Sequence, residues 1–169
     1  PNPMAGLPPR RPPSPPPFRG GGGGPAAPPT TLTGMPVRPD ITALAGEGYS
    51  PSNGVINLLV WGGSLGARVF SDVVPAALAA LSPALRARLQ VTQQARAEDV
   101  ERVAAAYRAA GIPARIAPFL NDVPERLRTA HLVIGRAGGS SVAELTVAGR
   151  PSLLVPLPIA ARDEQGANA

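Results

Sequence analysis

The sequence predicts an α/β protein in which a doubly wound, Rossmann-like parallel sheet of about five strands carries helices on both faces. From residue 52 onward, short apolar runs alternate with amphipathic helical patterns, and this alternation is typical of parallel sheets. The run VINLLVWGG at 55–63 is almost continuously apolar, as expected of a strand buried on both faces. Glycine- and serine-rich segments follow two of the runs, at the sheet edge where such proteins bind ligands.

Five strands are expected in order along the chain. The run at 55–63 is the first, and LQVTQQ at 89–94 is the second. The third, ARIAPFL at 114–120, is weakened by Pro118, because proline cannot donate a ladder hydrogen bond. HLVIGR at 131–136 and PSLLVPLP at 151–158 are the fourth and fifth.

Helices are expected between these strands. After GGSLGA, one stripe contains Phe70, Val74, Leu78 and Leu81, and Pro75 should kink or restart that helix. The segment 97–111 begins with two acidic residues and stops at a glycine, as helices do. A short helix over 121–130 has Asn121 or Asp122 as its cap, and another helix spans 141–149.

The beginning of the chain has a different composition. Residues 1–31 are mostly Pro, Gly, Ala and Arg, with the run PPSPPPFRGGGGG. Such a segment buries too little apolar surface to offset its ordering entropy, so we expect it to be disordered. The folding unit is then about residues 32–169.

Charge and composition exclude several classes of protein. The net charge is +5 and all 16 basic residues are Arg, but they form no basic stripe with interleaved aromatics, so no nucleic-acid partner is expected. The absence of Cys excludes disulfides and fits a reducing compartment. No apolar run approaches the roughly 18 residues of a membrane span and no signal-peptide core is present, so a cytoplasmic location is expected.

Two glycine-containing segments are candidates for phosphate binding. GGSLGA at 62–67 follows a strand and opens a helix, so it is either a phosphate cradle or only a tight turn. In AGGSSVAE at 137–144, Ser140 and Ser141 place hydroxyls at a helix N-terminus, which favours anions. The alternative is a capping box, in which Glu144 bonds an N-terminal N–H and Ser141 is the cap.

The remaining polar residues do not predict a catalytic or metal site. His131 is the only histidine and has no nearby partner for a triad, so we interpret it as structural. No His, Asp and Glu cluster has metal-ligand spacing, so neither a metal nor a tightly bound cofactor is expected. DEQGANA at 163–169 fits either a ligand loop or a helix start.

Five ordered segments together resemble the MurG family of peptidoglycan glycosyltransferases. They are TGMPVR (33–38), GGSLGAR (62–68), FLNDV (119–123), GRAGGSSVAEL (135–145) and PSLLVPLP with DEQGANA (151–169). The family moves GlcNAc from UDP-GlcNAc to undecaprenyl-diphospho-muramyl-pentapeptide, converting lipid I to lipid II. The resemblance implies a GT-B fold of two Rossmann-like domains, of which this chain matches the C-terminal, donor-binding one.

The resemblance also implies a set of donor contacts. Arg38 in an interdomain linker and Ser64, with Gly63, in the glycine loop would contact UDP-GlcNAc. The backbone of Leu120 would meet the uracil, and Glu144 would bind the ribose hydroxyls. Gln165 would touch the sugar, and the diphosphate would be held by Gly139, Ser140 and Ser141.

The domain organisation implied by the resemblance is a linker-like segment at 32–51 followed by the donor-binding domain at 52–169, incomplete at its C-terminus. The acceptor domain, which carries the proposed catalytic base and docks on the cytoplasmic face of the bacterial inner membrane, is expected to be missing. The chain would then contain no catalytic residue and be inactive alone. The alternatives are a non-catalytic nucleotide-sugar-binding module and the donor subunit of a split transferase. The family's frequent His-Gln pair is replaced here by Gln93-Gln94.

Overall fold

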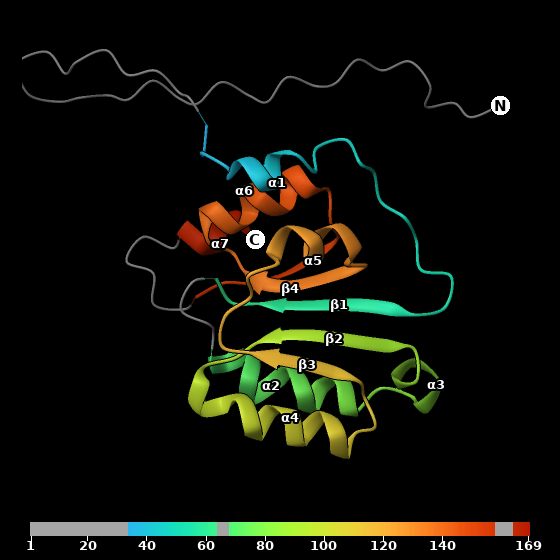
Figure 1. Cartoon of the computed structure of the whole chain (residues 1–169). Helices are drawn as coiled ribbons and strands as arrows, with labels where there is room; N and C mark the ends of the chain where they lie inside the picture. Colours follow the sequence, from blue (N-terminus) through green and yellow to red (C-terminus); the bar gives the residue numbers. More distant parts are fainter. Residues whose placement is uncertain (1–33, 64–67, 158–163) are drawn as a thin grey trace, which may run out of the picture. The chain divides into compact units, whose positions relative to one another are not determined.

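The computed structural model describes residues 34–63, 68–157 and 164–169 (Figure 1). The described strands form one sheet in the order β3-β2-β1-β4-β5, and every neighbouring pair is parallel. The predicted fold class is therefore confirmed, whereas the disorder expected of residues 1–31 lies outside the described residues. The strands are β1 Ile56–Trp61, β2 Leu89–Gln94, β3 Ala114–Ala117, β4 Leu132–Arg136 and β5 Ser152–Val155.

Helices cover both faces of the sheet (Figure 1). The helices α2 and α4 lie together on one face, and α1, α5 and α6 lie on the other. A short 3₁₀ turn at Ala97–Asp99 leads into α4. The helices are α1 Pro39–Thr42, α2 Arg68–Ala79, α3 Pro83–Arg86, α4 Val100–Ala109, α5 Val123–Thr129, α6 Gly139–Ala148 and α7 Glu164–Asn168.

The core consists of two apolar clusters, one on each side of the sheet. Strand β1 supplies both clusters alternately, because successive side chains of a strand point to opposite faces. Leu58 and Val60 pack towards α2 and α4, and Leu59 and Trp61 pack towards α1, α5 and α6. This double burial explains why the first apolar run has no polar alternation.

The observed strands are shorter than the apolar runs that predicted them. Strand β3 ends at Ala117 and not at residue 120, because Pro118 has no N–H with which to continue the ladder. The last pairing of β2 with β3 is Gln94 with Ala117, and the N–H of Ala95 then donates to the Ala117 carbonyl at 3.1 Å. Beyond this point the chain leaves the sheet.

The sequence predicts that Pro75 kinks or restarts its helix, and the restart is wrong, because α2 runs through Pro75 as one helix. Proline cannot donate to the carbonyl four residues earlier, which belongs to Ser71. In the structure Arg102 of α4 donates through Nη1 to that carbonyl at 3.4 Å. A neighbouring helix therefore partners the group that Pro75 leaves free.

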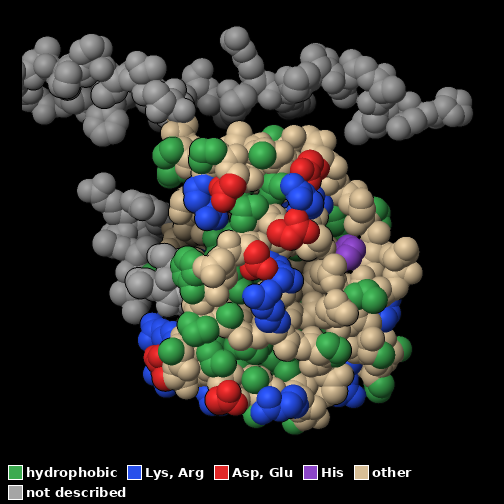
Figure 2. All heavy atoms as spheres, viewed as in Figure 1, with side chains coloured by type: hydrophobic (Ala, Val, Ile, Leu, Met, Phe, Trp, Pro, Cys, Tyr) green, Lys and Arg blue, Asp and Glu red, His purple; other side chains and the backbone are tan. Residues whose placement is uncertain are grey.

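Acidic and basic side chains are interspersed on the surface, as Figure 2 shows for one face. Several of them form ion pairs, including Arg126 with Asp122 at 2.7 Å and Arg128 with Glu47 at 2.9 Å. The face shown carries no continuous basic stripe. Among the described residues, no helix has the length and apolar character needed to cross a membrane.

Candidate functional site

A cavity of about 310 Å³ opens at the carboxyl ends of the strands. The chain runs outwards from β1 to β3 and then returns to β4 on the other side of β1. This is the switch point at which ligands of doubly wound sheets bind. The lining comes from the last residues of β1 and β2, the loops after β1 and β3, helices α5 and α6, and one residue that precedes α1: Arg38, Trp61, Gly63, Gln94, Phe119, Leu120, Val123, Ser140, Ser141 and Glu144.

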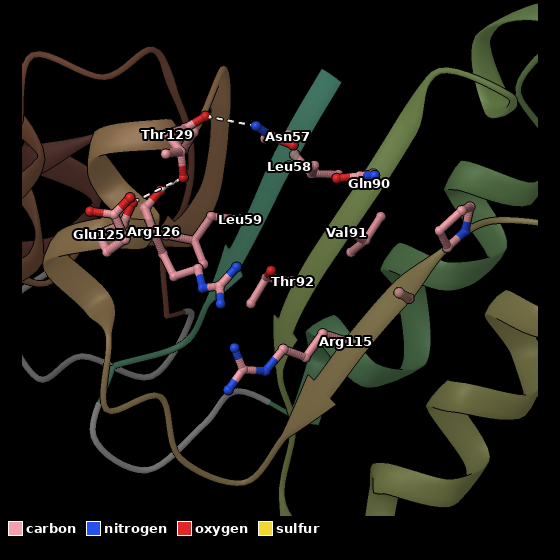
Figure 3. A pocket seen from close by; sticks show the side chains of 13 residues that line it. Asn57, Leu58, Leu59, Gln90, Val91, Thr92, Arg115, Glu125, Arg126 and Thr129 are labelled. Carbon is pink, nitrogen blue, oxygen red and sulfur yellow. Dashed lines mark hydrogen bonds between the residues drawn. The ribbon is translucent and has the colours of Figure 1, made fainter. Parts of the chain in front are cut away.

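A larger cavity, of about 630 Å³, lies between α5 and the face of β2 and β3 (Figure 3). Its lining comes from α5 and from the amino-terminal parts of the strands, such as Asn57 and Gln90, at the edge opposite the carboxyl ends, and it contains no glycine. The guanidinium groups of Arg115 and Arg126 point into it (Figure 3), but both are paired with Asp122. The switch-point cavity is therefore the better candidate for a ligand site.

The N-terminus of α6 forms one wall of the candidate site. The helix begins at Gly139 with Gly138 as its N-cap, and no side chain caps it. Its first N–H groups have no partner within the helix and carry the positive end of its dipole. The capping-box alternative is wrong, because Ser141 lies inside the helix and Glu144 does not bond the N-terminal backbone.

The carboxylate of Glu144 is bound instead by Arg38, which lies 106 positions earlier in the chain. Arg38 Nε donates to Oε1 at 2.8 Å and Nη2 donates to Oε2 at 3.3 Å. Glu144 is only 7% exposed, whereas the Arg38 side chain is 49% exposed. The hydrogen bond to Glu144 raises the pKa of Arg38. The carboxylate is thus held in place while its remaining lone pairs can still accept hydrogen bonds from hydroxyl groups.

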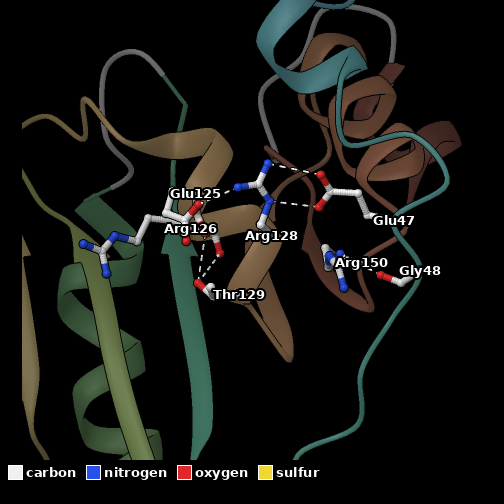
Figure 4. A network of polar contacts seen from close by, with 7 residues as sticks. All are labelled: Glu47, Gly48, Glu125, Arg126, Arg128, Thr129 and Arg150. Carbon is white, nitrogen blue, oxygen red and sulfur yellow. Dashed lines mark hydrogen bonds and ion pairs between the residues drawn. The ribbon is translucent and has the colours of Figure 1, made fainter.

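The segment that carries Arg38 is packed onto the rest of the fold, although it was predicted only as a linker. Ile41 of α1 and Leu44 after it are buried in the core beside α6. Further along, Glu47 binds Arg128 of α5 through both carboxylate oxygens, at 2.9 and 3.1 Å (Figure 4). Arg150 donates to the carbonyl of Gly48 at 2.8 Å. These contacts fix Arg38 relative to α6.

The loops after β1 and β3 complete the cavity. Gly63 has a φ of +79°, a conformation that glycine adopts without strain. Ser64, the predicted donor contact beside it, lies outside the described residues. After β3, Leu120 is 4% exposed and anchored in the core, whereas its neighbour Phe119 is 64% exposed and also lines the cavity.

Two of the predicted donor contacts are not in the lining of this cavity. Gly139 lies under Met35, whose terminal carbon would be 2.9 Å from a Cβ at that position. The side chain of Gln165 in α7 accepts a hydrogen bond from the N–H of Leu157 at 2.9 Å. The structure therefore gathers Arg38, Gly63, Leu120, Ser140, Ser141 and Glu144, but leaves Gly139 and Gln165 outside.

Four lining residues did not emerge as site residues from the sequence: Trp61, Gln94, Phe119 and Val123. Trp61 looked like an ordinary strand residue. Gln94 is the last residue of the predicted strand 89–94, and its place at the carboxyl edge of the sheet was the available signal. Phe119 stands beside a predicted contact, and its exposure could not be foreseen from an apolar run.

His131 has a structural role, as expected. The imidazole Nδ1 accepts a hydrogen bond from the backbone N–H of Asn57 at 2.9 Å, and the backbone N–H of His131 donates to the Asn57 carbonyl at 2.9 Å. These bonds join the start of β4 to β1. Within 34–63, 68–157 and 164–169, no three His, Cys, Asp or Glu side chains are grouped so that they could hold a metal ion.

Comparison with known proteins identifies the family. Residues 57–169 match the model of the glycosyltransferase family 28 C-terminal domain. The chain belongs to this family. The matched residues include the strands, the loops and most of the site described above.

Relatives of this family 28 chain are much longer than the part it matches. The enzyme named UDP-N-acetylglucosamine–N-acetylmuramyl-(pentapeptide) pyrophosphoryl-undecaprenol N-acetylglucosamine transferase from Gluconobacter oxydans is 69% identical over 139 residues, which are 82% of this chain and 38% of that protein. The protein of that name from Granulibacter bethesdensis is 63% identical over 83% of this chain and 37% of its own length. The crystal structure of Acinetobacter baumannii MurG matches with a TM-score of 0.64 and 34% identity, over 72% of this chain and 36% of that one.

Proposed function

We propose that this chain is the donor-binding half of an inverting GlcNAc transferase that uses UDP-GlcNAc and acts on undecaprenyl-diphospho-muramyl-pentapeptide. Family membership and the names of the relatives support the reaction and both substrates. The observation that carries the proposal is the convergence of Arg38, Glu144 and the N-terminus of α6 on one cavity at the switch point.

The chemistry of this cavity suits a nucleoside diphosphate. The uncapped N-terminus of α6 offers N–H groups and a positive dipole end, which together favour phosphate. Glu144 offers carboxylate oxygens to a ribose diol, and the loop at Phe119 and Leu120 offers backbone groups and an apolar surface to a base. The chain's part in transfer would be to position the diphosphate and to stabilise its charge as it leaves.

The other expectations belong to the same proposal. Gly63, Ser64, Gly139 and Gln165 would complete the donor contacts, and no tightly bound cofactor would be required, since the helix N-terminus can face the leaving diphosphate. The acceptor would be held by an N-terminal domain like that of the relatives. The full-length enzyme would act at the cytoplasmic face of the bacterial inner membrane, as the family resemblance implies.

Calorimetric titration of the 169-residue chain tests the proposal directly. We expect UDP and UDP-GlcNAc to bind with a 1:1 stoichiometry, and ADP to bind much more weakly because the base loop would be shaped for a pyrimidine. Failure of UDP to bind, or equal binding of UDP and ADP, would contradict the proposal. An Arg108→Ala variant is a suitable control, because Arg108 is exposed on α4, on the other side of the sheet from α6, and lies outside the cavity lining.

A further inference from the structure

A buried glutamine connects the end of β2 to the loop that follows β3. Gln94 is the last residue of β2, is 2% exposed, and lines the switch-point cavity. Its Nε2 donates to the carbonyl of Pro118 at 3.2 Å. Because a carbonyl only accepts hydrogen bonds, this contact fixes which end of the amide faces Pro118.

The loop that receives this hydrogen bond has little other backbone support. The parallel ladder between β2 and β3 ends at Ala117. Among the described residues, no backbone-to-backbone hydrogen bond joins residues 118–121 to a neighbouring strand, and a turn at 121–122 then leads into α5. The Gln94 amide therefore continues the sheet's hydrogen bonding by one step, at the point where Pro118 ends the ladder.

The oxygen of the same Gln94 amide lowers the stability of the fold. Gln94 Oε1 is buried and has no hydrogen-bond partner among the described residues. A buried acceptor that is left unpaired is destabilising, so an apolar side chain of similar size would be at least as good for packing. Pro118 is exposed, so water could replace the hydrogen bond that its carbonyl would lose. Stability alone thus gives little reason for a glutamine here.

We propose that Gln94 is a positioning residue for the nucleotide base. By holding the Pro118 carbonyl, it sets the path of the backbone at Phe119 and Leu120, the segment that would contact the uracil. This inference rests on the proposed function, because it assumes that the cavity binds UDP. It adds that selection between pyrimidine bases depends on a side chain that need not touch the ligand.

The neighbouring glutamine provides a matched control. Gln93 is also fully buried, but it points to the opposite face of β2, where its Oε1 accepts a hydrogen bond from the Tyr107 hydroxyl at 2.6 Å. Gln93→Met would leave that hydroxyl unpaired in the core, so we expect it to lower the melting temperature without altering nucleotide binding. Gln94→Met should instead alter nucleotide binding without lowering the melting temperature.

The experiment compares the wild-type chain, Gln94→Met and Gln93→Met in three measurements: melting temperature, calorimetric titration with UDP and CDP, and amide hydrogen exchange without nucleotide. For Gln94→Met we expect an unchanged or higher melting temperature. We also expect UDP binding that is about threefold to tenfold weaker, with CDP binding little changed. The amides of Phe119, Leu120 and Asn121 should exchange faster than in the wild type.

Three results would overturn the inference, and each has a distinct meaning. If the wild type binds UDP but Gln94→Met keeps the same UDP-to-CDP ratio and the same exchange rates, Gln94 does not position the loop. If Gln94→Met melts as low as Gln93→Met with nucleotide selectivity intact, its role is structural. If the wild type does not bind UDP, the proposed function fails and the base-positioning role fails with it.

Discussion

Glu144 is a carboxylate in an unusual position, nearly buried one turn into a helix that begins at the cavity. A buried charge is destabilising unless it is paired, and the bidentate contact with Arg38 provides that pairing. The pair alone would explain why Glu144 is tolerated. It does not explain why the pair lies beside an uncapped helix N-terminus at the switch point of the sheet.

Replacing Glu144 with alanine should weaken nucleotide binding. If the carboxylate binds the ribose hydroxyls, Glu144→Ala removes hydrogen bonds to a charged group, which are worth about 1.5–3 kcal/mol. The dissociation constant for UDP would then rise roughly 10- to 150-fold, as calorimetric titration would measure.

The control for this prediction is a ligand without the ribose hydroxyls. A 2′,3′-dideoxy analogue of UDP should bind the wild type weakly and should be nearly insensitive to Glu144→Ala. If the variant melts at a lower temperature but binds UDP as the wild type does, Glu144 serves only to pair with Arg38.

Because of Tyr107, the free energy of unfolding should depend on pH in the alkaline range. Burial raises the pKa of the Tyr107 hydroxyl above its ordinary value of about 10. In the unfolded chain the hydroxyl ionises near that value, whereas in the folded chain it remains neutral. The free energy of unfolding should therefore be unaffected by this group below pH 10 and should fall as the pH rises above it.

Tyr107→Phe should reduce that alkaline decline, since it removes the ionising group. At neutral pH the variant should be less stable by about 1–3 kcal/mol, because it leaves Gln93 Oε1 buried without its donor. Urea unfolding at pH 7 and at several values above pH 10 would measure both effects. An alkaline decline as steep in the variant as in the wild type would exclude Tyr107 as its cause.

At the scale of elements, the sequence was sufficient for the type and order of the strands but not for their ends. The five predicted runs contain the five strands, and the signal is clearest for β1, whose burial on both faces leaves a continuous apolar pattern. The edge strands β3 and β5 contain no fully buried residue. The ends depend on hydrogen bonds between strands, which a single run cannot reveal. Helix α6 also begins two residues earlier than the predicted 141, at Gly139. The short α1 and α3 gave no periodic signal because each has four residues.

Pro75 shows how a neighbouring element can override a local rule. A proline inside a helix costs about 3 kcal/mol relative to alanine, and here Arg102 compensates by bonding the Ser71 carbonyl. Pro75→Ala would restore the helical hydrogen bond but would lose some buried ring surface, at about 0.8 kcal/mol per methylene. We expect a net gain in stability of about 1 kcal/mol, measurable by urea unfolding. A loss of stability would mean that packing of the ring dominates.

At the scale of the whole molecule, the sequence located the site better than it identified the contacts. Parallel strands bring their carboxyl ends to one edge, so segments as far apart as 62–67 and 137–144 could be expected to meet there. The pairing of Arg38 with Glu144 could not be expected, because a contact across 106 positions depends on how α1 packs on α6. The contact of Gln94 could not be predicted for a similar reason, since its hydrogen-bond partner is the backbone carbonyl of Pro118 in the loop after another strand.

The 169-residue chain by itself should not transfer GlcNAc. It spans about 38% of the Gluconobacter oxydans relative, and a donor-binding half can position only one of the two substrates. Holding both substrates in attack geometry can supply on the order of 7–11 kcal/mol of barrier reduction, which a half-site would forgo. An assay with UDP-GlcNAc and a lipid I analogue should therefore give no turnover above background.

A chimera distinguishes an incomplete enzyme from a module that only binds nucleotide sugars. The parts of the Gluconobacter oxydans enzyme that precede and follow its match to this chain can be fused ahead of residue 34 and after residue 169, and the identity of 69% over the matched residues makes this exchange conservative. If the chain is a donor half, the chimera should transfer GlcNAc, and Glu144→Ala in the chimera should reduce that activity in parallel with its loss of UDP affinity. A folded chimera that binds UDP but remains inactive would favour the binding module, and turnover by the chain alone would show that the catalytic groups lie within it.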